Sequence, residues 1–329
     1  MAVTIKDIAE CAGVSFSTVS KALRNSPLVQ EATKKKVIEV AAKMGYQPNF
    51  TARRLVSKKS GVIGVVWPSI ERFTLSALIT TINDLLEKES YTTMLSINRI
   101  ESAIEAFHRF QVDAILLFSD RNLMMGNPLM LQTNLPILNY GIAGTAPYPT
   151  IDVQRGTAIE LAMQHIFELG HKHIAYIGSP NYHDPMQAQK VQAYQEAMDR
   201  YGLQAHIVPS KGMESHDGYL AAKSLLLDPS TEDRTTAIIS GSFDLTRGII
   251  RAADESGHSI PNQLSIVCYD NFKQSDNLDI PVTAVGVDFD EIANHISQTL
   301  LQMINGEETP SAILLEPELV IRSSTASLL

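Results

Sequence analysis

Cysteine is scarce in this chain of 329 residues. The two cysteines, Cys11 and Cys268, lie far apart and form no C-x-x-C motif. Their number and spacing exclude a disulfide framework and the paired-cysteine pattern of a zinc site. Cys11 falls in a helical pattern and Cys268 in a strand pattern, so we expect both thiols to be buried and inert.

Long apolar runs are missing as well. No stretch reaches the roughly 20 apolar residues that span a bilayer, and Asp7 and Glu10 lie where a signal peptide would be basic and then apolar. We therefore expect a cytoplasmic protein without a membrane partner. The glycines form no G-x-G-x-x-G motif, and there is neither a nucleophile motif nor a plausible pair of acids. The sequence thus predicts no enzyme, no cofactor and no catalytic residue.

Charge is distributed unevenly along the chain. Residues 1–60 contain eleven Lys and Arg against four Asp and Glu, whereas the remaining residues contain 16 against 32. The formal net charge is −9, and 44% of the residues are hydrophobic. A basic head on an acidic globular body is typical of a DNA-binding module joined to a sensor, because the head attracts DNA and the body repels it.

The segment 3–24 has the pattern of two short helices joined by a tight turn. Apolar residues recur at helical spacing before Gly13, a residue that tolerates a left-handed conformation at a helix end. Ser15 stands at an N-cap position, and Val19 and Ala22 mark the buried face of the second helix. The outward face carries Phe16, Ser17, Thr18, Ser20, Lys21 and Arg24. That face suits the major groove of DNA, although an ordinary helix pair with a solvated polar face gives the same pattern.

Two further segments complete the basic head. Residues 31–44 predict a third helix that ends at Gly45. Asn49 can cap a short helix running to about residue 56, which carries Arg53 and Leu55. This helix is too short to be stable alone, so we expect it to fold only on DNA.

The pattern changes beyond Gly61, where short apolar runs alternate with helical stretches. Such alternation predicts parallel sheets covered on both faces, here as two doubly wound α/β lobes. The predicted strands are 62–67, 92–97, 113–118, 136–140, 174–177, 237–240, 264–269 and 283–287. The predicted helices include 75–89, 156–169, 186–201, 217–227, 246–256 and 291–304. Ligands of such folds bind past the carboxyl ends of the strands, here in the cleft between the lobes.

Motifs along the whole chain carry a family resemblance. Residues 4–20 read T-I-K-D-I-A-x-x-A-G-V-S-x-x-T-V-S, and residues 45–55 read G-Y-x-P-N-x-x-A-R-x-L. The body contains I-G-V-V-x-P from residue 63, V-D-A-I-L from 112, L-G-H-x-x-I-A-x-I-G from 169 and P-x-x-L-S-I-V-x-Y-D from 261. With these motifs in this order, the sequence resembles the LacI/GalR family of bacterial transcription regulators.

The resemblance implies three parts. Residues 1–47 would form a helix-turn-helix DNA-binding domain, 48–60 a hinge helix and linker, and 61–329 a two-lobed effector-binding and dimerisation domain of the periplasmic, ribose-binding type. The protein would then be a homodimer on a pseudo-palindromic operator, more often a repressor in this family, with operator affinity set by a carbohydrate or a derivative. No leucine heptads follow Arg322, so we expect no tetramer-forming tail.

The resemblance also implies which residues contact DNA. Base edges would be read by Phe16, Ser17 and Lys21, the last in place of a common arginine. Phosphates would lie near Ser15, Thr18, Ser20, Arg24 and Asn25. In the minor groove, Asn49, Arg53 and Leu55 would act together, with Leu55 as an apolar wedge between base pairs. The alternative for Leu55 is a plain packing residue of the linker.

The effector pocket is carried over in the same way. It would comprise Ser69, Arg72, Phe73, Lys190, Met213, Ser242, Phe243, Asp270 and Phe289. Lys190 replaces an arginine of many members, and Ser242 and Phe243 replace an Asn-Asp pair, so the polar clamp is partly rebuilt. Asp270 with Lys190 suits a neutral hydroxylated ligand, whereas Arg72 with Lys190 would hold a carboxylate or phosphate. Both cations could instead lie on a solvated surface.

Three other hypotheses stay open from the sequence. The body could respond to a partner protein, with little response to small molecules. A transport-type sugar-binding protein is a second alternative, but the basic head and the lack of a signal peptide speak against it. His171 and His173 have the look of a metal pair, yet their place at a helix end favours capping or packing, so we expect no metal site.

Overall fold

The computed structural model describes residues 3–23, 26–46, 59–67, 72–118, 133–144, 147–179, 184–227 and 235–328. The chain divides into two compact units, Met1–Ser60 and Gly61–Leu329. The predicted hinge helix, with Asn49, Arg53 and Leu55, lies outside the described residues. Within the described ranges, no helix has both the length and the apolar character needed to cross a membrane.

The head is a three-helix unit of α1 (Ile5–Ala12), α2 (Phe16–Leu23) and α3 (Glu31–Lys43). Thr4 and Asp7 cap α1 reciprocally, and Gly13 ends it in the left-handed region at φ 67°. The three apolar faces close on one small core, made of Ile8, Ala12, Val19, Ala22, Val29, Val37 and Ala41. The predicted helix-turn-helix fold is confirmed.

Two side chains of the head differ from expectation. Cys11 is exposed rather than buried, because it lies about a quarter turn from the face of α1 that Ile8 and Ala12 bury. Lys34 is buried, which is rare for a lysine, and its ammonium lies 2.6 Å from a Glu31 oxygen. Cys268 is buried, as predicted.

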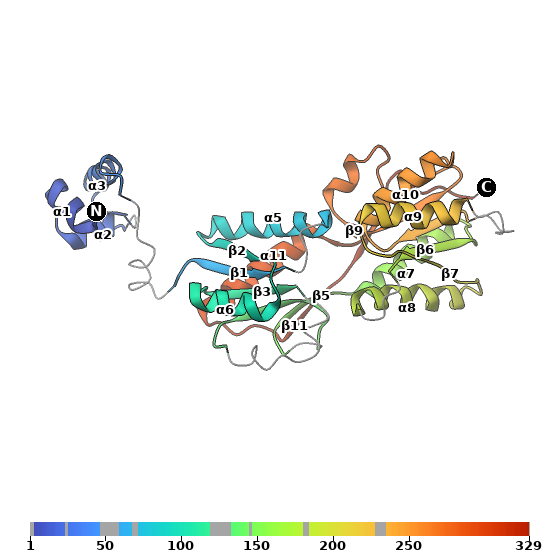
Figure 1. Ribbon diagram of the computed structural model, residues 1–329, viewed down its shortest axis with the longest axis horizontal. Helices are drawn as coiled ribbons and strands as arrows, with labels where there is room; N and C mark the ends of the chain where they lie inside the picture. Colours follow the sequence, from blue (N-terminus) through green and yellow to red (C-terminus); the bar gives the residue numbers. More distant parts are fainter. Residues whose placement is uncertain are drawn as a thin grey trace. The chain divides into compact units, whose positions relative to one another are not determined.

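The first lobe of the body is a parallel sheet in the order β2-β1-β3-β4-β5-β11 (Figure 1). Helices α5 (Phe73–Lys88) and α11 (Phe289–Asn305) cover one face, and α6 (Ile100–Phe110) covers the other. The strands are β1 (Val62–Val66), β2 (Thr92–Ser96), β3 (Ala114–Phe118), β4 (Ile137–Gly141), β5 (Thr150–Val153) and β11 (Ala312–Leu315).

The second lobe repeats this order as β7-β6-β8-β9-β10-β12, with only β12 antiparallel to its neighbour among the described strands. Helices α7 (Arg155–Glu168) and α8 (Pro185–Arg200) cover one face, and α9 (Ser215–Leu226) and α10 (Phe243–Glu255) the other. The strands are β6 (Ile174–Gly178), β7 (His206–Pro209), β8 (Ala237–Ser240), β9 (Ser265–Asn271), β10 (Thr283–Asp288) and β12 (Glu318–Val320), and a short 3₁₀ helix, η3 (Lys273–Asn277), follows β9.

The chain passes between the lobes three times. It leaves the first lobe between β5 and α7, returns between β10 and α11, and leaves again between β11 and β12. Neither lobe is therefore a continuous piece of the sequence.

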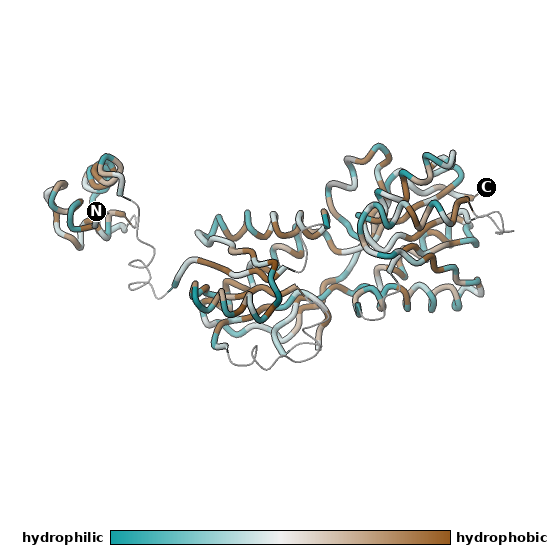
Figure 2. The backbone as a smooth tube through the Cα atoms, viewed as in Figure 1, coloured by the Kyte–Doolittle hydropathy of each residue, from teal (hydrophilic) through white to brown (hydrophobic). Residues whose placement is uncertain are grey.

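Apolar strands form the interior of both lobes, as the brown colour along them in Figure 2 shows. Every residue of β3 and of β6 is buried, since helices cover both faces of each sheet. The predicted strands and helices agree with the structure to within three residues at their ends. The prediction left out α6 and the short strands β5, β7, β11 and β12.

Two glycines bring α9 and α10 into backbone contact. A methyl group added to Gly218 would lie 2.3 Å from the Leu245 carbonyl oxygen. A methyl group added to Gly248 would lie 1.8 Å from the Ser215 carbonyl oxygen and 2.5 Å from the Tyr219 nitrogen. Each helix thus supplies one residue without a side chain where the two cross.

Candidate DNA-binding surface and effector site

Helix α2 presents a polar face on the head, and local hydrogen bonds fix its start. The Ser15 hydroxyl accepts the Thr18 amide hydrogen at 3.1 Å and lies 2.8 Å from the Ser17 and Thr18 hydroxyls. This is the predicted N-cap. Val19 and Ala22 are fully covered by the head core on the opposite face.

The polar face of α2 is partly exposed to solvent. The Phe16 ring is 53% exposed, and Ser17 and Lys21 are exposed as well. Thr18 and Ser20 are half-buried. A helix of this diameter fits the major groove, where an ammonium, hydroxyls and an aromatic ring can contact guanine edges, phosphates and thymine methyls. Arg24 and Asn25, which would extend this surface, lie outside the described residues.

In the body, the predicted effector residues gather where parallel strands end. Phe73 follows β1, Ser242 and Phe243 follow β8, Asp270 is the second-last residue of β9, and Phe289 follows β10. In the first lobe, the strands that follow β1 in the chain lie on both sides of it: β2 on one side and β3 on the other. In the second lobe, β7 and β8 flank β6 in the same way. Open α/β sheets bind ligands at such a switch point. Ser69 lies outside the described residues.

Lys190 of α8 points into the interior rather than to solvent. Its side chain is buried, its ammonium donates to the Gly241 carbonyl oxygen at 2.9 Å, and it lies 3.5 Å from the centre of the Tyr269 ring. Burial lowers the pKa of the Lys190 ammonium well below its usual value, although Asp270 opposes the shift. The solvated-surface alternative for Lys190 is therefore wrong.

Asp270 forms the acidic side of the same site. Its backbone has φ 112°, an unusual conformation for a residue with a side chain, and its carboxylate accepts the Phe243 amide hydrogen at 2.9 Å. Burial raises the pKa of the Asp270 carboxyl, and Lys190 opposes this shift. The two groups thus stabilise each other's charged forms next to the same turn, residues 241–243.

Several predicted residues support this site instead of presenting polar groups to it. The Ser242 hydroxyl caps α10 by accepting the Leu245 amide hydrogen at 3.3 Å. The Phe243 ring is 2% exposed and packs edge-on against Phe272, with 4.4 Å between ring centres. The Phe289 ring stacks on the Phe272 ring, with 5.0 Å between ring centres. Met213 packs, half-buried, against the core beneath α9 and α10.

The first lobe contributes two residues to the predicted site, Arg72 and Phe73. Arg72 precedes α5, is half-buried, and its Nε is a buried atom without a hydrogen-bond partner among the described residues. Its positive charge is close enough to lower the pKa of Lys190, after the larger effect of burial. Phe73 is 43% exposed and faces Phe243 and Phe272 of the second lobe, with 6.2 Å between ring centres in each pair.

Other residues near the site were not predicted from the sequence. Tyr269 provides the ring beneath Lys190, and Asp244, next to the predicted Phe243, contacts the first lobe. The Tyr176 hydroxyl and the Gln187 side-chain oxygen are buried and have no partner among the described residues. Tyr269 is part of the P-x-x-L-S-I-V-x-Y-D motif, but the motif assigns it no role, and the roles of all four residues depend on which strand ends meet in space.

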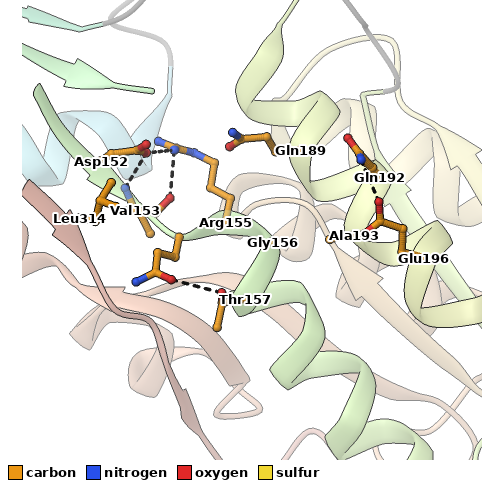
Figure 3. Close-up of a pocket in the computed structure, with 11 residues that line it drawn as sticks. Asp152, Val153, Arg155, Gly156, Thr157, Gln189, Gln192, Ala193, Glu196 and Leu314 are labelled. Carbon is orange, nitrogen blue, oxygen red and sulfur yellow. Dashed lines mark hydrogen bonds and ion pairs between the residues drawn. The ribbon is translucent and has the colours of Figure 1, made fainter. Parts of the chain in front are cut away.

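A separate groove of about 370 Å³ lies at the crossover from β5 to α7 (Figure 3). Its lining consists of residues 152–157, Gln189, Gln192, Ala193, Glu196 and Leu314. The buried Arg155 guanidinium binds the Asp152 carboxylate and the Val153 carbonyl oxygen at its base. None of the predicted effector residues lines this groove. We therefore assign these contacts to the connection from β5 to α7 that joins the two lobes.

His171 is a packing residue, and the described residues contain no cluster of three or more His, Cys, Asp or Glu suited to a metal. Its Nε2 donates to the Ala326 carbonyl oxygen at 3.0 Å, and its Nδ1 lies 2.9 Å from the Thr236 hydroxyl. Both ring nitrogens of the neutral imidazole therefore have hydrogen-bond partners. These contacts support packing for His171, whereas His173 is exposed, and the expectation of no metal site stays a prediction.

We expect His171 to make the body less stable in mild acid. Burial lowers the pKa of the His171 imidazole in the folded protein. In the unfolded chain, the pKa of this histidine is about 6.5. As the pH falls below that pKa, the unfolded chain takes up the proton before the folded protein does, so the free energy of unfolding decreases. Urea unfolding between pH 7.5 and 5 should show a smaller decrease for His171→Gln than for the wild type. The exposed control His108→Gln should retain the full decrease, and equal slopes for all three proteins would contradict the assignment.

Comparison with known proteins finds relatives along the whole chain. The pattern described as "Bacterial regulatory proteins, lacI family" matches residues 4–49, and a periplasmic binding protein-like domain matches 163–325. Catabolite control protein A of Priestia megaterium is 30% identical over 336 residues, covering 99% of this chain and 100% of that protein.

Solved structures share the fold. A lac repressor dimer bound to operator and the anti-inducer ONPF has a TM-score of 0.81 and 24% identity, covering 99% of this chain and 100% of that one. A LacI family regulator from Enterococcus faecium with bound ribose has a TM-score of 0.71 and 22% identity, covering 82% and 100%.

Proposed function

The chain belongs to the lacI family of bacterial regulatory proteins, and from this premise we propose how its residues bind DNA and effector. It is a DNA-binding transcription regulator with a helix-turn-helix head and a two-lobed effector-binding body. We assign it the role of a repressor that acts in the cytoplasm as a homodimer and has no catalytic activity. Its domains are the head at 1–47, the hinge at 48–60 and the body at 61–329.

The exposed face of α2 is the observation that supports DNA contact by the head. Phe16, Ser17 and Lys21 would read base edges, and the hydroxyls beside them would bind phosphates. A homodimer places two such helices about a two-fold axis, so its operator is a pseudo-palindrome. Selection from random-sequence DNA tests this: the bound fraction should converge on a dyad-symmetric site, and convergence on a single half-site would overturn the dimer assignment.

For the body we propose a neutral sugar or sugar derivative as effector, held by Lys190 and Asp270. One Lys190 hydrogen already binds Gly241, and the Asp270 carboxylate beside Lys190 already balances its charge, so an anionic ligand would be repelled by Asp270. The remaining ammonium hydrogens and the Asp270 carboxylate offer donors and an acceptor suited to hydroxyl groups. The ribose held by the Enterococcus faecium regulator of the same fold supports this ligand class.

A thermal-shift screen should identify the effector class. At about 100 times its Kd, a bound ligand adds roughly 2.7 kcal/mol of stability. We expect this shift from neutral sugars, and we expect Lys190→Met and Asp270→Asn each to abolish it. Lys172→Met, a change at an exposed lysine, should leave it intact.

Other results of the screen would change the proposal. A shift caused only by sugar acids or sugar phosphates would make Arg72 and Lys190 an anion clamp. No shift with any sugar or derivative would overturn the carbohydrate assignment.

A further inference from the structure

Residues 241–244 join β8 to the first turn of α10, and both of the proposed effector residues bind this segment, which we call the 241–244 turn. Lys190 donates to the Gly241 carbonyl oxygen at 2.9 Å. Asp270 accepts the Phe243 amide hydrogen at 2.9 Å. Any movement of either side chain toward a ligand therefore acts on the backbone of this turn.

The same turn reaches the other lobe through Asp244. One carboxylate oxygen of Asp244 accepts the Phe73 amide hydrogen at 3.3 Å. The other accepts the Thr74 amide hydrogen at 3.3 Å and the Thr74 hydroxyl at 2.6 Å. Both Asp244 and Thr74 are almost fully buried.

These bonds cap a helix from outside its own lobe. Phe73 and Thr74 are the first residues of α5, where amide hydrogens have no acceptor within the helix. Arg72 occupies the N-cap position of α5 but supplies no side-chain cap. Asp244 thus provides the side-chain cap that a serine or aspartate at the N-cap position of the helix normally provides.

Aromatic contacts surround this cap. The Phe73 ring lies 6.2 Å from the Phe243 and Phe272 rings, measured between centres, and the Arg247 guanidinium lies 5.9 Å from its centre. Covering a charged hydrogen bond with apolar side chains excludes water and strengthens the bond.

We propose that Asp244 is the positioning residue that couples the effector site to α5. It holds the two lobes in the arrangement of this structure, and a ligand that moves Lys190 or Asp270 displaces the 241–244 turn and breaks the α5 cap. The proposal rests on the effector site proposed above. Its test uses neither effector nor DNA, so the two proposals fail separately.

Hydrogen exchange measures the cap directly. Because the Phe73 and Thr74 amides have no acceptor within α5, Asp244→Ala should speed their exchange roughly tenfold or more. Asp254→Ala, a matched change at an exposed site on α10, should leave these rates unchanged. Exchange of the amides of residues 245–248 shows whether α10 itself remains folded in each variant. Should Asp244→Ala not fold, Thr74→Val removes one hydroxyl from the other side of the same contact and should give a smaller increase.

A distance between the lobes tests the wider claim. Spin labels are placed on cysteines at the exposed positions 88 and 199, with Cys11 changed to Ser. Mixing with excess unlabelled protein leaves one labelled protomer in each dimer, so the labels give one distance distribution across the body. Asp244→Ala should broaden and shift this distribution relative to Asp254→Ala. Faster exchange with an unchanged distribution would reduce Asp244 to a local cap and overturn the coupling.

Transmission from the effector site has its own test. Asp270 does not bind α5, yet Asp270→Ala removes the acceptor for the Phe243 amide and should speed exchange at Phe73 and Thr74. Asp270→Asn keeps an acceptor oxygen and should restore slow exchange. Unchanged exchange at α5 in Asp270→Ala would show that the turn carries no signal and would overturn the proposal.

Discussion

Replacing Gly248 with alanine is expected to lower the free energy of unfolding of the body by about 3 kcal/mol or more. The added methyl group would lie 1.8 Å from the Ser215 carbonyl oxygen, which belongs to the backbone of α9 and cannot rotate away. Relief requires that α9 and α10 separate, and the core beneath them, with Leu245 and Ile249, then loses its packing.

Denaturant unfolding provides the measurement, and Gly156→Ala is the matched control. Gly156 also lies in a helix, but the nearest atom to an added methyl group there is 3.8 Å away. That variant should be unchanged or more stable by up to about 1 kcal/mol, because alanine restricts the unfolded chain. Equal midpoints for Gly248→Ala and Gly156→Ala would show that the two helices separate without cost.

Reversing the charge of Lys21 is expected to weaken binding to the selected operator by about 100-fold. The side chain is exposed on α2, so Lys21→Glu should leave the melting temperature of the protein unchanged. The loss combines one missing contact with repulsion from the phosphates beside it. Lys21→Ala should show the contact alone, at roughly tenfold.

Lys43→Glu separates a specific contact from the general charge of the head. Lys43 is exposed near the end of α3, so this variant changes the net charge of the head equally. It should bind the operator far better than Lys21→Glu when both are measured by fluorescence anisotropy at one salt concentration. Equal losses would assign the Lys21 effect to net charge and remove α2 from the recognition surface.

The head was predictable almost residue by residue because its signals are local. Thr4 and Ser15 cap the starts of α1 and α2, left-handed glycines follow α1 and α3, and each helix has one apolar face. Thr4, Gly13 and Ser15 all act within four residues of their partners. Cys11 shows the limit of that reasoning: a helical pattern predicts which face is buried but places a flanking residue poorly.

The body was predictable as alternating strands and helices, but its short edges were not. The strands β11 and β12 have four and three residues, with polar neighbours and half-exposed side chains. The spacing of Ile100, Ala103, Ile104 and Phe107 was a usable signal for α6.

Within the effector site, position at a strand end was predictable and side-chain direction was not. The sequence placed Lys190 and Asp270 near the cleft, but not the Gly241 carbonyl that binds the lysine. It also left out Asp244, whose partners lie 170 and 171 residues away along the chain. No local pattern encodes a contact that depends on two lobes closing on each other.

The three crossings between the lobes also determine the order in which parts of the protein can fold during translation. The head is complete once residue 46 has left the ribosome, because all of its core residues precede that point. The first lobe still lacks α11 until residue 305 and β11 until residue 315. A chain whose synthesis stops between those points therefore carries a finished head on an unfinished sensor. Such a fragment also lacks the complete body that we propose pairs two heads, so it should bind a pseudo-palindromic operator weakly.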